Sequence, residues 1–359
     1  MLHDIIAAYG LPANDCQLQT IDSGLINRTW KVTAADKEYV LQQINSDVFK
    51  SPHDISENIR KISRFLARHA PGYLFISPIV ATSGAYLVQN SAGDFYRLTP
   101  FVAGSHTIDT VSTRQEAYEA ARQFGRFTSL LSGFDTQELH YTLPNFHNLG
   151  LRFEQFKAAY KQASPERLAA AEQSVRDAFS HQGLVQTYQS IKANKDIPLR
   201  VIHHDTKISN VLFDEAGKGL CVIDLDTVMP GYFISDVGDM MRTYLSPVNE
   251  EEKDLGSISI REDYFAAVME GYFSDMAKQL TPAEKELCLY AGKFMIYMQA
   301  LRFLTDFLSG DTYYATSYPK QNLVRTQNQF TLLKRYIEAE DRLQQIISDF
   351  LQKEQTSGI

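Results

Sequence analysis

Residues 203–210 read HHDTKISN, and residues 222–226 read VIDLD. A short strand-like run, LRVI (199–202), leads into the first stretch, and the second stretch ends an apolar run of its own. Both have the pattern of a short strand followed by a polar loop, and loops held by a rigid scaffold commonly carry chemistry. Asp224 follows Asp205 by nineteen positions, and this spacing decides the fold.

The first stretch fits the kinase catalytic-loop pattern H-R-D-x-x-x-x-N at His203, Asp205 and Asn210. Lys207 stands where many kinases also have lysine, and Asp224 stands where a kinase has its metal-binding aspartate. One carboxylate can orient and deprotonate an attacking hydroxyl, while a second carboxylate and an amide hold Mg²⁺. A nearby lysine offsets negative charge on the transferred phosphoryl group. The pattern predicts phosphoryl transfer.

Each part of this pattern also has a simpler explanation, because an HxD tripeptide is common by chance, Asn210 suits a turn and Asp224 suits a loop cap. The two motifs together, HxDxKxxN and IDxD, are much more specific. The adjacent His203 and His204 are of a type that binds zinc, but neighbouring residues usually point in different directions and no spaced Cys/His set accompanies them. We expect His203 to brace the loop and the metal to be Mg²⁺.

The residues before position 102 have the pattern of a small sheet domain. Four apolar residues recur at helical spacing after Pro52, namely Ile55, Ile59, Ile62 and Leu66. Five strand-like runs are separated by turn signals and lie at 16–21, 27–34, 38–44, 85–90 and 95–101. We predict an N-terminal, nucleotide-binding lobe at 1–102 with an antiparallel sheet and one helix.

From Thr113 onward the pattern is mainly helical. Thr113 and Glu116 form a capping box at the start of a helix that extends to about residue 131. Further helices are predicted near 150–162, 164–192, 235–246, 261–277, 282–308 and 320–352, with strand-like pieces at 199–226. We predict a catalytic and substrate-binding helical lobe at 103–359. The predicted fold class is α+β, a two-lobed protein-kinase-like fold.

The composition excludes several classes of protein. The 359 residues carry a net charge of -8 and no dense Lys/Arg run, so nucleic acid is not the expected partner. The three cysteines form no CxxC pair, which fits a reducing compartment. No apolar run approaches the roughly 20 residues that cross a bilayer, and MLHDIIAAYG lacks the features of a signal peptide. We expect a soluble cytoplasmic protein without a membrane partner, either monomer or homodimer.

The nucleotide-binding residues are less clearly marked, since neither a GxxxxGK[ST] nor a GxGxxG motif is present. The turn DSGLINRTW (22–30), which includes Gly24, can cover phosphates or be an ordinary hairpin. Gln42 stands where a kinase strand has its phosphate-pairing lysine, which is a departure. Thr99 and Phe101, in FYRLTPF, can supply backbone groups for adenine, and the same segment can link two domains. We expect ATP contacts at these four residues.

The chain resembles the aminoglycoside phosphotransferase and choline kinase superfamily, and within it the bacterial N-acetylhexosamine 1-kinases. The resemblance extends over nearly the whole chain. It is carried by YVLQQIN (39–45), FHNLGLRFEQF (146–156), HHDTKISNVLF (203–213), VIDLDTVMPGYFISDVGDMMR (222–242) and LRFLTDFLSGDTYYATSYPKQNLVRTQNQ (301–329). It implies transfer of the γ-phosphate of ATP, with Mg²⁺, to the anomeric hydroxyl of an N-acetylhexosamine, giving a sugar 1-phosphate.

The resemblance also implies roles for single residues. Asp205 corresponds to the catalytic base, assisted by Lys207, and Asn210 and Asp224 correspond to the Mg²⁺ ligands. Asp226 corresponds to an accessory carboxylate near the metal or the substrate.

Further positions correspond to the sugar site. Arg302 matches an arginine that faces the sugar in the relative, and on its own it has the pattern of a charge on a helix surface. His147 and Arg152 match positions near the mouth of the substrate site, where a plain loop or salt-bridge role is the alternative. Tyr313, Tyr314 and Tyr318 either line the same face or pack.

Two departures leave the acceptor open. Leu25 stands where the hexosamine kinase has histidine, and FHNLGLRF stands where it has FHDTPHRF. Leucine cannot form a hydrogen bond with a sugar hydroxyl. A kinase for another sugar or for an amino alcohol is therefore an alternative, and the amino alcohol site would favour clustered aromatics and acids. A third alternative is a non-catalytic nucleotide-binding regulator, which Gln42 favours and the intact motif disfavours.

Overall fold

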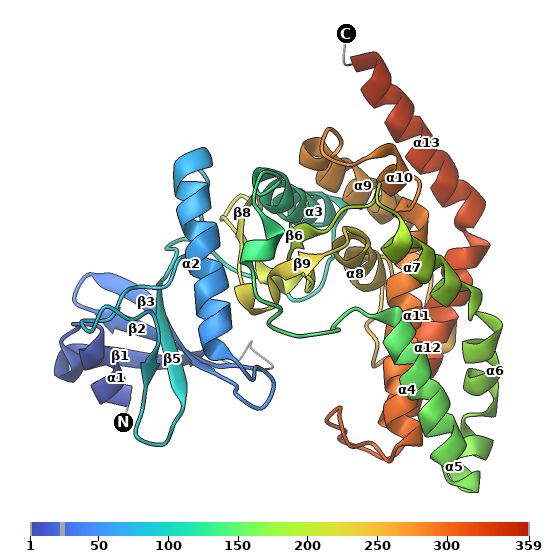
Figure 1. Cartoon of the computed structure of the whole chain (residues 1–359), viewed down its shortest axis with the longest axis horizontal. Coiled ribbons are helices and arrows are strands. Elements are labelled where there is room, and N and C mark those ends of the chain that lie inside the picture. Colours follow the sequence, from blue (N-terminus) through green and yellow to red (C-terminus); the bar gives the residue numbers. More distant parts are fainter. Residues whose placement is uncertain (1, 22–25, 358–359) are drawn as a thin grey trace. The chain divides into compact units, whose positions relative to one another are not determined.

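The computed structural model describes residues 2–21 and 26–357 (Figure 1). The chain forms two compact units. Unit 1 consists of Met1–Thr107, Leu130–Pro144 and Asn210–Pro230, and unit 2 consists of Ile108–Ser129, Asn145–Ser209 and Gly231–Ile359. The predicted α+β class is confirmed, because a small antiparallel sheet dominates the first unit and helices dominate the second.

Unit 1 is built on a five-stranded antiparallel sheet with strand order β1-β2-β3-β5-β4. The strands are β1 (Cys16–Ile21), β2 (Arg28–Ala34), β3 (Lys37–Ile44), β4 (Val88–Gln89) and β5 (Phe95–Pro100). The register between β3 and β5 places Gln42 directly opposite Arg97. This pairing brings a cation beside the position where the sequence lacks the expected lysine.

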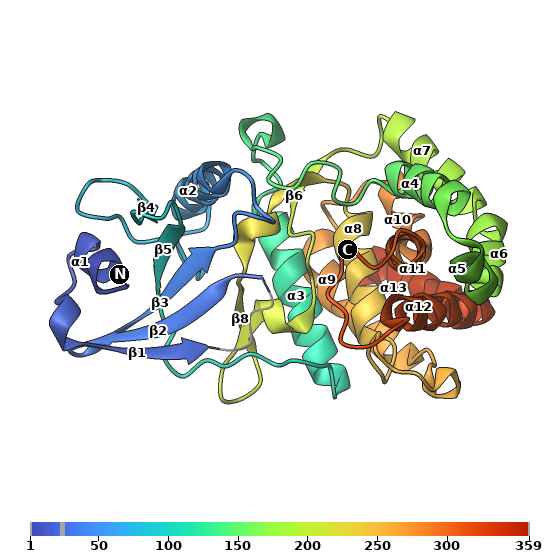
Figure 2. The same ribbon diagram turned by 90° about the horizontal axis from the view of Figure 1, so that it is seen from below.

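Two helices complete the sheet domain of unit 1. α1 (Leu2–Ala8) was not predicted and lies beside the sheet (Figure 2). Its Ile5 and Ile6 pack with Val32, Leu41 and Leu98 of the sheet in one apolar core. α2 (Pro52–His69) buries the four apolar residues that the sequence pattern had indicated, so that prediction is confirmed. Burial of these apolar side chains is the main stabilising contribution at this position.

The remaining segments of unit 1 include the strands β7 (Val211–Phe213) and β8 (Gly219–Val222), which pair as an antiparallel hairpin. Short 3₁₀ turns flank the hairpin, η3 at Ile208–Asn210 and η4 at Leu225–Thr227. The fully buried Asn58 of α2 connects two further segments of unit 1, one at His140 and one at Val228. Its side-chain amide donates to the carbonyls of His140 (2.8 Å) and Val228 (3.2 Å), which satisfies a polar group that would be costly to bury alone.

Unit 2 is a helical assembly around α11 (Cys288–Leu308), which is buried on nearly all sides and packs against α4, α8 and α12 (Figure 1). In Figure 2 the green helices α4 to α7 lie together on one side of this unit. The other helices are α3 (Arg114–Leu130), α4 (Leu149–Gln162), α5 (Pro165–Ala170), α6 (Glu172–Ser180), α7 (Gly183–Ala193), α8 (Ile234–Tyr244), α9 (Glu262–Met276), α10 (Pro282–Lys285), α12 (Gln321–Glu338) and α13 (Glu340–Ser357). Two further short strands are β6 (Arg200–Ile202) in unit 2 and β9 (Met229–Gly231), where unit 1 passes into unit 2.

The helix boundaries confirm the predictions that correspond to α3, α4, α8 and α9, and they correct three others. Thr113 and Glu116 form the reciprocal hydrogen bonds of a capping box, at 3.1 and 3.2 Å. The single helix predicted at 164–192 is instead α5, α6 and α7, and Gly183 begins the last of them. The helix predicted at 320–352 breaks at the buried Ala339, and the one predicted at 282–308 breaks between α10 and α11. Alanine and leucine favour helices and carry no signal that ends one, so tertiary packing sets the positions of these breaks.

None of the helices in the described part of the chain combines the length and apolar character that crossing a bilayer requires.

Candidate active site

The loop HHDTKISN is held by two buried carboxylates of α8 in unit 2. Asp236 accepts the backbone N–H groups of His203 (2.9 Å) and His204 (2.7 Å). Asp239 accepts the N–H of Thr206 at 2.8 Å. The backbone on both sides of Asp205 is therefore fixed by charge-assisted hydrogen bonds, which are stronger than neutral ones.

No role was predicted for Asp236 or Asp239 from the sequence. A signal was present, because two carboxylates three positions apart in an apolar helix segment, ISDVGDMM, lie on one face of that helix. Burial raises the pKa of Asp236 to about 6, against the hydrogen bonds from the loop. Burial and then the charge of Asp205 raise the pKa of Asp239, while Arg242 opposes this rise. The two carboxylates support the loop from within the protein.

Asp205 and Lys207 are more accessible than these supporting groups. The Lys207 Nζ lies 3.2 Å from Oδ2 of Asp205, and the side chains are 38% and 26% exposed, respectively. The preceding His203 is fully buried, with its ring edge against Phe124 at a centroid distance of 5.1 Å. Asp205 is thus the carboxylate of this loop that an incoming hydroxyl can reach.

In unit 1, Asn210 and Asp224 are brought to adjacent positions. The N–H of Ile223 donates to the carbonyl of Asn210 at 2.8 Å, which extends the β7–β8 ladder by one bond. Asp224 follows at once and has a left-handed backbone, with φ of 58°. Carboxylate and amide oxygens are ligands that suit Mg²⁺, so the chemistry of this pair fits the predicted metal.

Asp226, predicted as an accessory carboxylate, lies buried in a polar network of unit 1. Its carboxylate accepts from Arg97 Nη1 and from Asn27 Nδ2, the latter at 2.8 Å. Arg97 Nε donates to the Oε1 of Gln42 at 2.9 Å. Burial disfavours the charge of Arg97, but Asp226 and then Asp224 raise its pKa. Arg97 was not predicted from the sequence, although pairing of the strands 38–44 and 95–101 would have indicated it.

Two other predicted ATP contacts, Thr99 and Phe101, lie at the end of the same sheet. Phe101 N–H donates to the carbonyl of Glu38 at 3.1 Å, and Lys31 Nζ lies 4.3 Å from the centre of the Phe101 ring. Thr99 belongs to β5, paired with Val40. Gly24 lies outside the described residues. These roles stay predictions.

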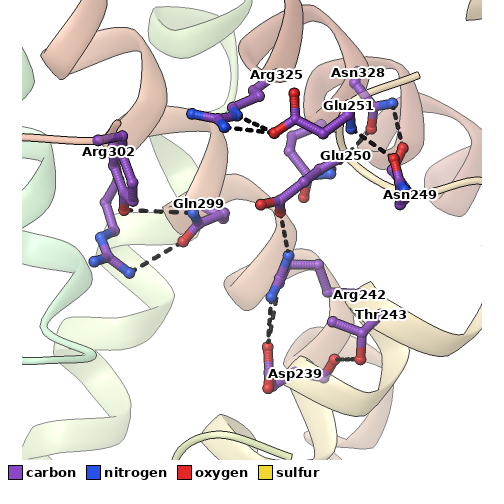
Figure 3. Close-up of polar contacts among 12 residues, drawn as sticks. Asp239, Arg242, Thr243, Asn249, Glu250, Glu251, Gln299, Arg302, Arg325 and Asn328 are labelled. Carbon is purple, nitrogen blue, oxygen red and sulfur yellow. Dashed lines mark hydrogen bonds and ion pairs between the residues drawn. The ribbon is translucent and has the colours of Figure 1, made fainter. Parts of the chain in front are cut away.

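A cavity of about 440 Å³ in unit 2 is lined by Arg152 and Arg302. Its walls come from α4, from α11 and from the segment 312–314. Arg302 Nη1 donates to Oε1 of Gln299 at 3.1 Å (Figure 3). Arg152 donates to Gln155 Oε1 at 3.0 Å and to two backbone carbonyls. The structure therefore brings two predicted sugar contacts together in one hollow.

His147, the third predicted contact, lies next to this cavity. Its ring stacks on Phe146 at 4.3 Å and lies 5.3 Å from the ring of His204. Burial, and then the charges of His204, Arg302, Arg152 and Arg242, hold the pKa of His147 well below its ordinary value. The imidazole is neutral at physiological pH, so it can contribute a hydrogen bond without adding charge.

Arg242 lies beside the catalytic loop, because its partner Asp239 holds Thr206 of that loop. It is ion-paired with Asp239 (3.0 Å) and with Glu250 (2.8 Å), as Figure 3 shows. These two carboxylates and then Asp205 raise its pKa, despite its burial, and Arg242 in turn acts on His147. Asp205, Arg242 and His147 are therefore successive electrostatic neighbours within unit 2.

A model of the phosphotransferase enzyme family matches residues 17–274, more than two thirds of the chain. The chain belongs to this phosphotransferase enzyme family. The superfamily predicted from the sequence is confirmed, and the assignment to N-acetylhexosamine 1-kinases stays a prediction.

Solved structures show the fold of this phosphotransferase in other proteins. A microcompartment-associated aminopropanol kinase matches with a TM-score of 0.60 and 16% identity, over 94% of this chain and 97% of that chain. An amicoumacin kinase in complex with AMP-PNP and Ca²⁺ matches with a TM-score of 0.59 and 14% identity, over 95% of this chain and 92% of that chain. Spectinomycin phosphotransferase in complex with ADP and spectinomycin matches with a TM-score of 0.61 and 14% identity, over 93% of this chain and 97% of that chain. The predicted kinase-like fold class is thereby confirmed.

Proposed function

We propose that this phosphotransferase is a sugar kinase that transfers the γ-phosphate of ATP to the anomeric hydroxyl of an N-acetylhexosamine, giving the sugar 1-phosphate. The observation that carries the proposal is the cavity of unit 2. It offers the guanidinium groups of Arg152 and Arg302 as hydrogen-bond donors, and the neighbouring His147 lies 5.3 Å from the ring of His204, which precedes Asp205 in the loop. Sugars are recognised through many hydrogen bonds to hydroxyl and carbonyl oxygens, which such donors supply.

In the proposed reaction Asp205 accepts the proton of the attacking hydroxyl, and Lys207 offsets charge on the phosphoryl oxygens. Asn210 and Asp224 are the residues that would hold Mg²⁺, which when bound neutralises charge on the phosphates. The similarity to an amicoumacin kinase with bound AMP-PNP and Ca²⁺ supports a nucleotide together with a divalent cation. Arg97 and Asn27 keep Asp226 in place beside this pair.

A kinase for an amino alcohol is the second candidate, and the similarity to an aminopropanol kinase favours it. A cationic acceptor is held most strongly where an available acid accompanies aromatic faces. The acid that lines the cavity, Asp306, accepts from the N–H groups of Thr312, Tyr313 and Tyr314 at 2.8 to 2.9 Å and from the amide of Asn322 at 2.9 Å. Because this carboxylate is already committed and two arginines line the same cavity, a sugar fits better.

A phosphorylation screen with ATP and Mg²⁺ tests the proposal. The acceptors are N-acetylglucosamine, N-acetylgalactosamine, glucosamine, galactose, choline and aminopropanol, and NMR identifies the phosphorylated position. We expect an N-acetylhexosamine phosphorylated at C1. Turnover of the amino alcohols alone would replace the sugar kinase by the second candidate, and no turnover of any hydroxyl compound would favour a non-catalytic regulator.

A further inference from the structure

Arg152 and Arg302 differ from the other arginines near the site in their partners. Arg242 is paired with Glu250, and Arg325 with Glu251 at 2.5 Å. Figure 3 shows Arg302 beside them, held by the neutral amide of Gln299. Within residues 2–21 and 26–357, no ion pair joins Arg302 or Arg152 to a carboxylate. The cavity therefore contains two positive charges that the protein does not neutralise by direct pairing.

The two charges also act on each other. Burial and then the charge of Arg302 lower the pKa of Arg152, as expected for like charges at close range. The acceptors of Arg152 are an amide and two carbonyls, all neutral, and its buried Nε has no hydrogen-bond partner in the described part of the chain. A buried donor without a partner costs free energy, and a ligand that accepts from it would recover this cost.

The remaining groups of the cavity offset only part of this charge. Asp306, the acid of the lining, accepts from backbone amides and from Asn322 and is ion-paired with neither arginine, so its single negative charge leaves one positive charge in excess. The lowered pKa of His147 keeps this neighbouring imidazole from adding a third cation. The chain as a whole carries a net charge of -8, so the local excess of positive charge is specific to this cavity.

We propose that the acceptor sugar carries an anionic group, a carboxylate or a phosphate, which Arg152 and Arg302 bind together. The inference rests on the proposed sugar kinase function and narrows its substrate class to acidic sugars. Guanidinium groups match the planar oxygen pair of a carboxylate and the oxygens of a phosphate through parallel N–H donors. The anion also removes the repulsion between the two arginines.

Matched acceptor pairs test this inference. Glucuronate is compared with glucose, N-acetylglucosaminuronate with N-acetylglucosamine, and glucosamine 6-phosphate with glucosamine. The readouts are kcat/KM from ADP release and, without ATP, calorimetric binding. We expect an acidic member to be favoured by about tenfold or more, mainly through KM, as one charged hydrogen-bonding contact provides. The carboxylate and phosphate arms show which anion is preferred.

Arg152→Gln and Arg302→Gln are expected to bring the ratio of acidic to neutral kcat/KM close to one, with an unchanged melting temperature. Arg176→Gln is the control, because Arg176 lies on α6, outside the cavity, in an exposed pair with Glu172. Equal turnover of both members by the unmodified protein would overturn the inference and leave the sugar kinase standing. If no sugar is phosphorylated, the proposed function fails, and the calorimetric arm alone then supports or overturns the anion site.

Discussion

Arg97 of β5 is ion-paired with Asp226, and the two side chains are only 5% and 1% exposed. Gln42 and Asn27 complete the network from two further positions of unit 1. Because Asp226 follows Asp224 by two residues, this pair fixes the segment with the predicted metal ligand against the sheet. The cation that the sequence lacks at position 42 is present on the neighbouring strand, where it has a structural partner.

We predict that Arg97→Met or Asp226→Leu alone destabilises the protein by about 3–5 kcal/mol, because each leaves a buried charge without its partner. The double variant should recover part of this loss, since neither charge then remains. Urea unfolding measures both. Arg114→Ala is the control, because its pair with Glu270 is exposed and should contribute at most about 1 kcal/mol. Single variants no less stable than the control would show that the pair has no structural role.

Asp205→Asn should lower kcat by about 100-fold or more, because an amide cannot accept the proton of the attacking hydroxyl. The fold should be unaffected, since Asp236 and Asp239 hold the loop by its backbone. Steady-state kinetics measure the loss, and calorimetry should show nearly unchanged ATP binding. A variant that keeps most of its rate would remove Asp205 from the role of base.

Asp224→Asn should raise the Mg²⁺ concentration at half-maximal rate by about tenfold or more, because a negatively charged oxygen ligand is lost. Asparagine tolerates the left-handed backbone at this position, so a change in folding does not confuse the result. Titration of the rate with Mg²⁺ measures the effect, and Mg²⁺-dependent ATP binding provides a second readout. An unchanged Mg²⁺ dependence in both would count against Asp224 as a ligand.

The local parts of the structure were predictable, and the long-range parts were not. The apolar spacing from Ile55 to Leu66 predicted α2, and the spacing of HxDxKxxN and IDxD predicted the family. Arg97, Asp236 and Asp239 were missed because their roles arise from contacts with residues 33 to 129 positions away. Such contacts depend on strand register and helix packing, which no local pattern specifies.

The helix breaks illustrate the same limit. Ala339 separates α12 from α13 although alanine is the best helix former. Its burial shows that packing against the rest of unit 2 sets the bend. The cavity was also not predictable from local sequence patterns, because Arg152 and Arg302 are 150 positions apart and line it together only when α4 packs on α11.

Gly125→Ala should destabilise unit 2 by about 1–3 kcal/mol through overpacking. A Cβ on Gly125 of α3 would lie 2.4 Å from the backbone oxygen of Tyr272 on α9, which cannot move without shifting the helix. Gly183→Ala is the matched control, because no atom lies within 4 Å of its Cβ position, and we expect it to be neutral or stabilising by up to about 1 kcal/mol. Thermal unfolding compares the two. Equal melting temperatures would contradict the close approach of α3 and α9.

Asp236 should make the stability depend on pH. Its pKa is raised to about 6 by burial, against about 4 in the unfolded chain, so the folded state holds the proton more tightly. The contribution of this group is therefore fully present below pH 4 and is lost as the pH rises through 6.

Asp236→Asn removes this ionisable group and leaves every other ionisable residue unchanged. From pH 4 to pH 7 the wild-type protein should lose on the order of 2–3 kcal/mol of unfolding free energy relative to the variant. Urea unfolding of both proteins at several pH values measures the difference. The N–H groups of His203 and His204 donate to different oxygens of Asp236, and asparagine keeps only one of these oxygens, so the variant starts from a lower stability. The slope of the difference with pH is the informative quantity, and a flat difference would show that folding does not raise the pKa of Asp236.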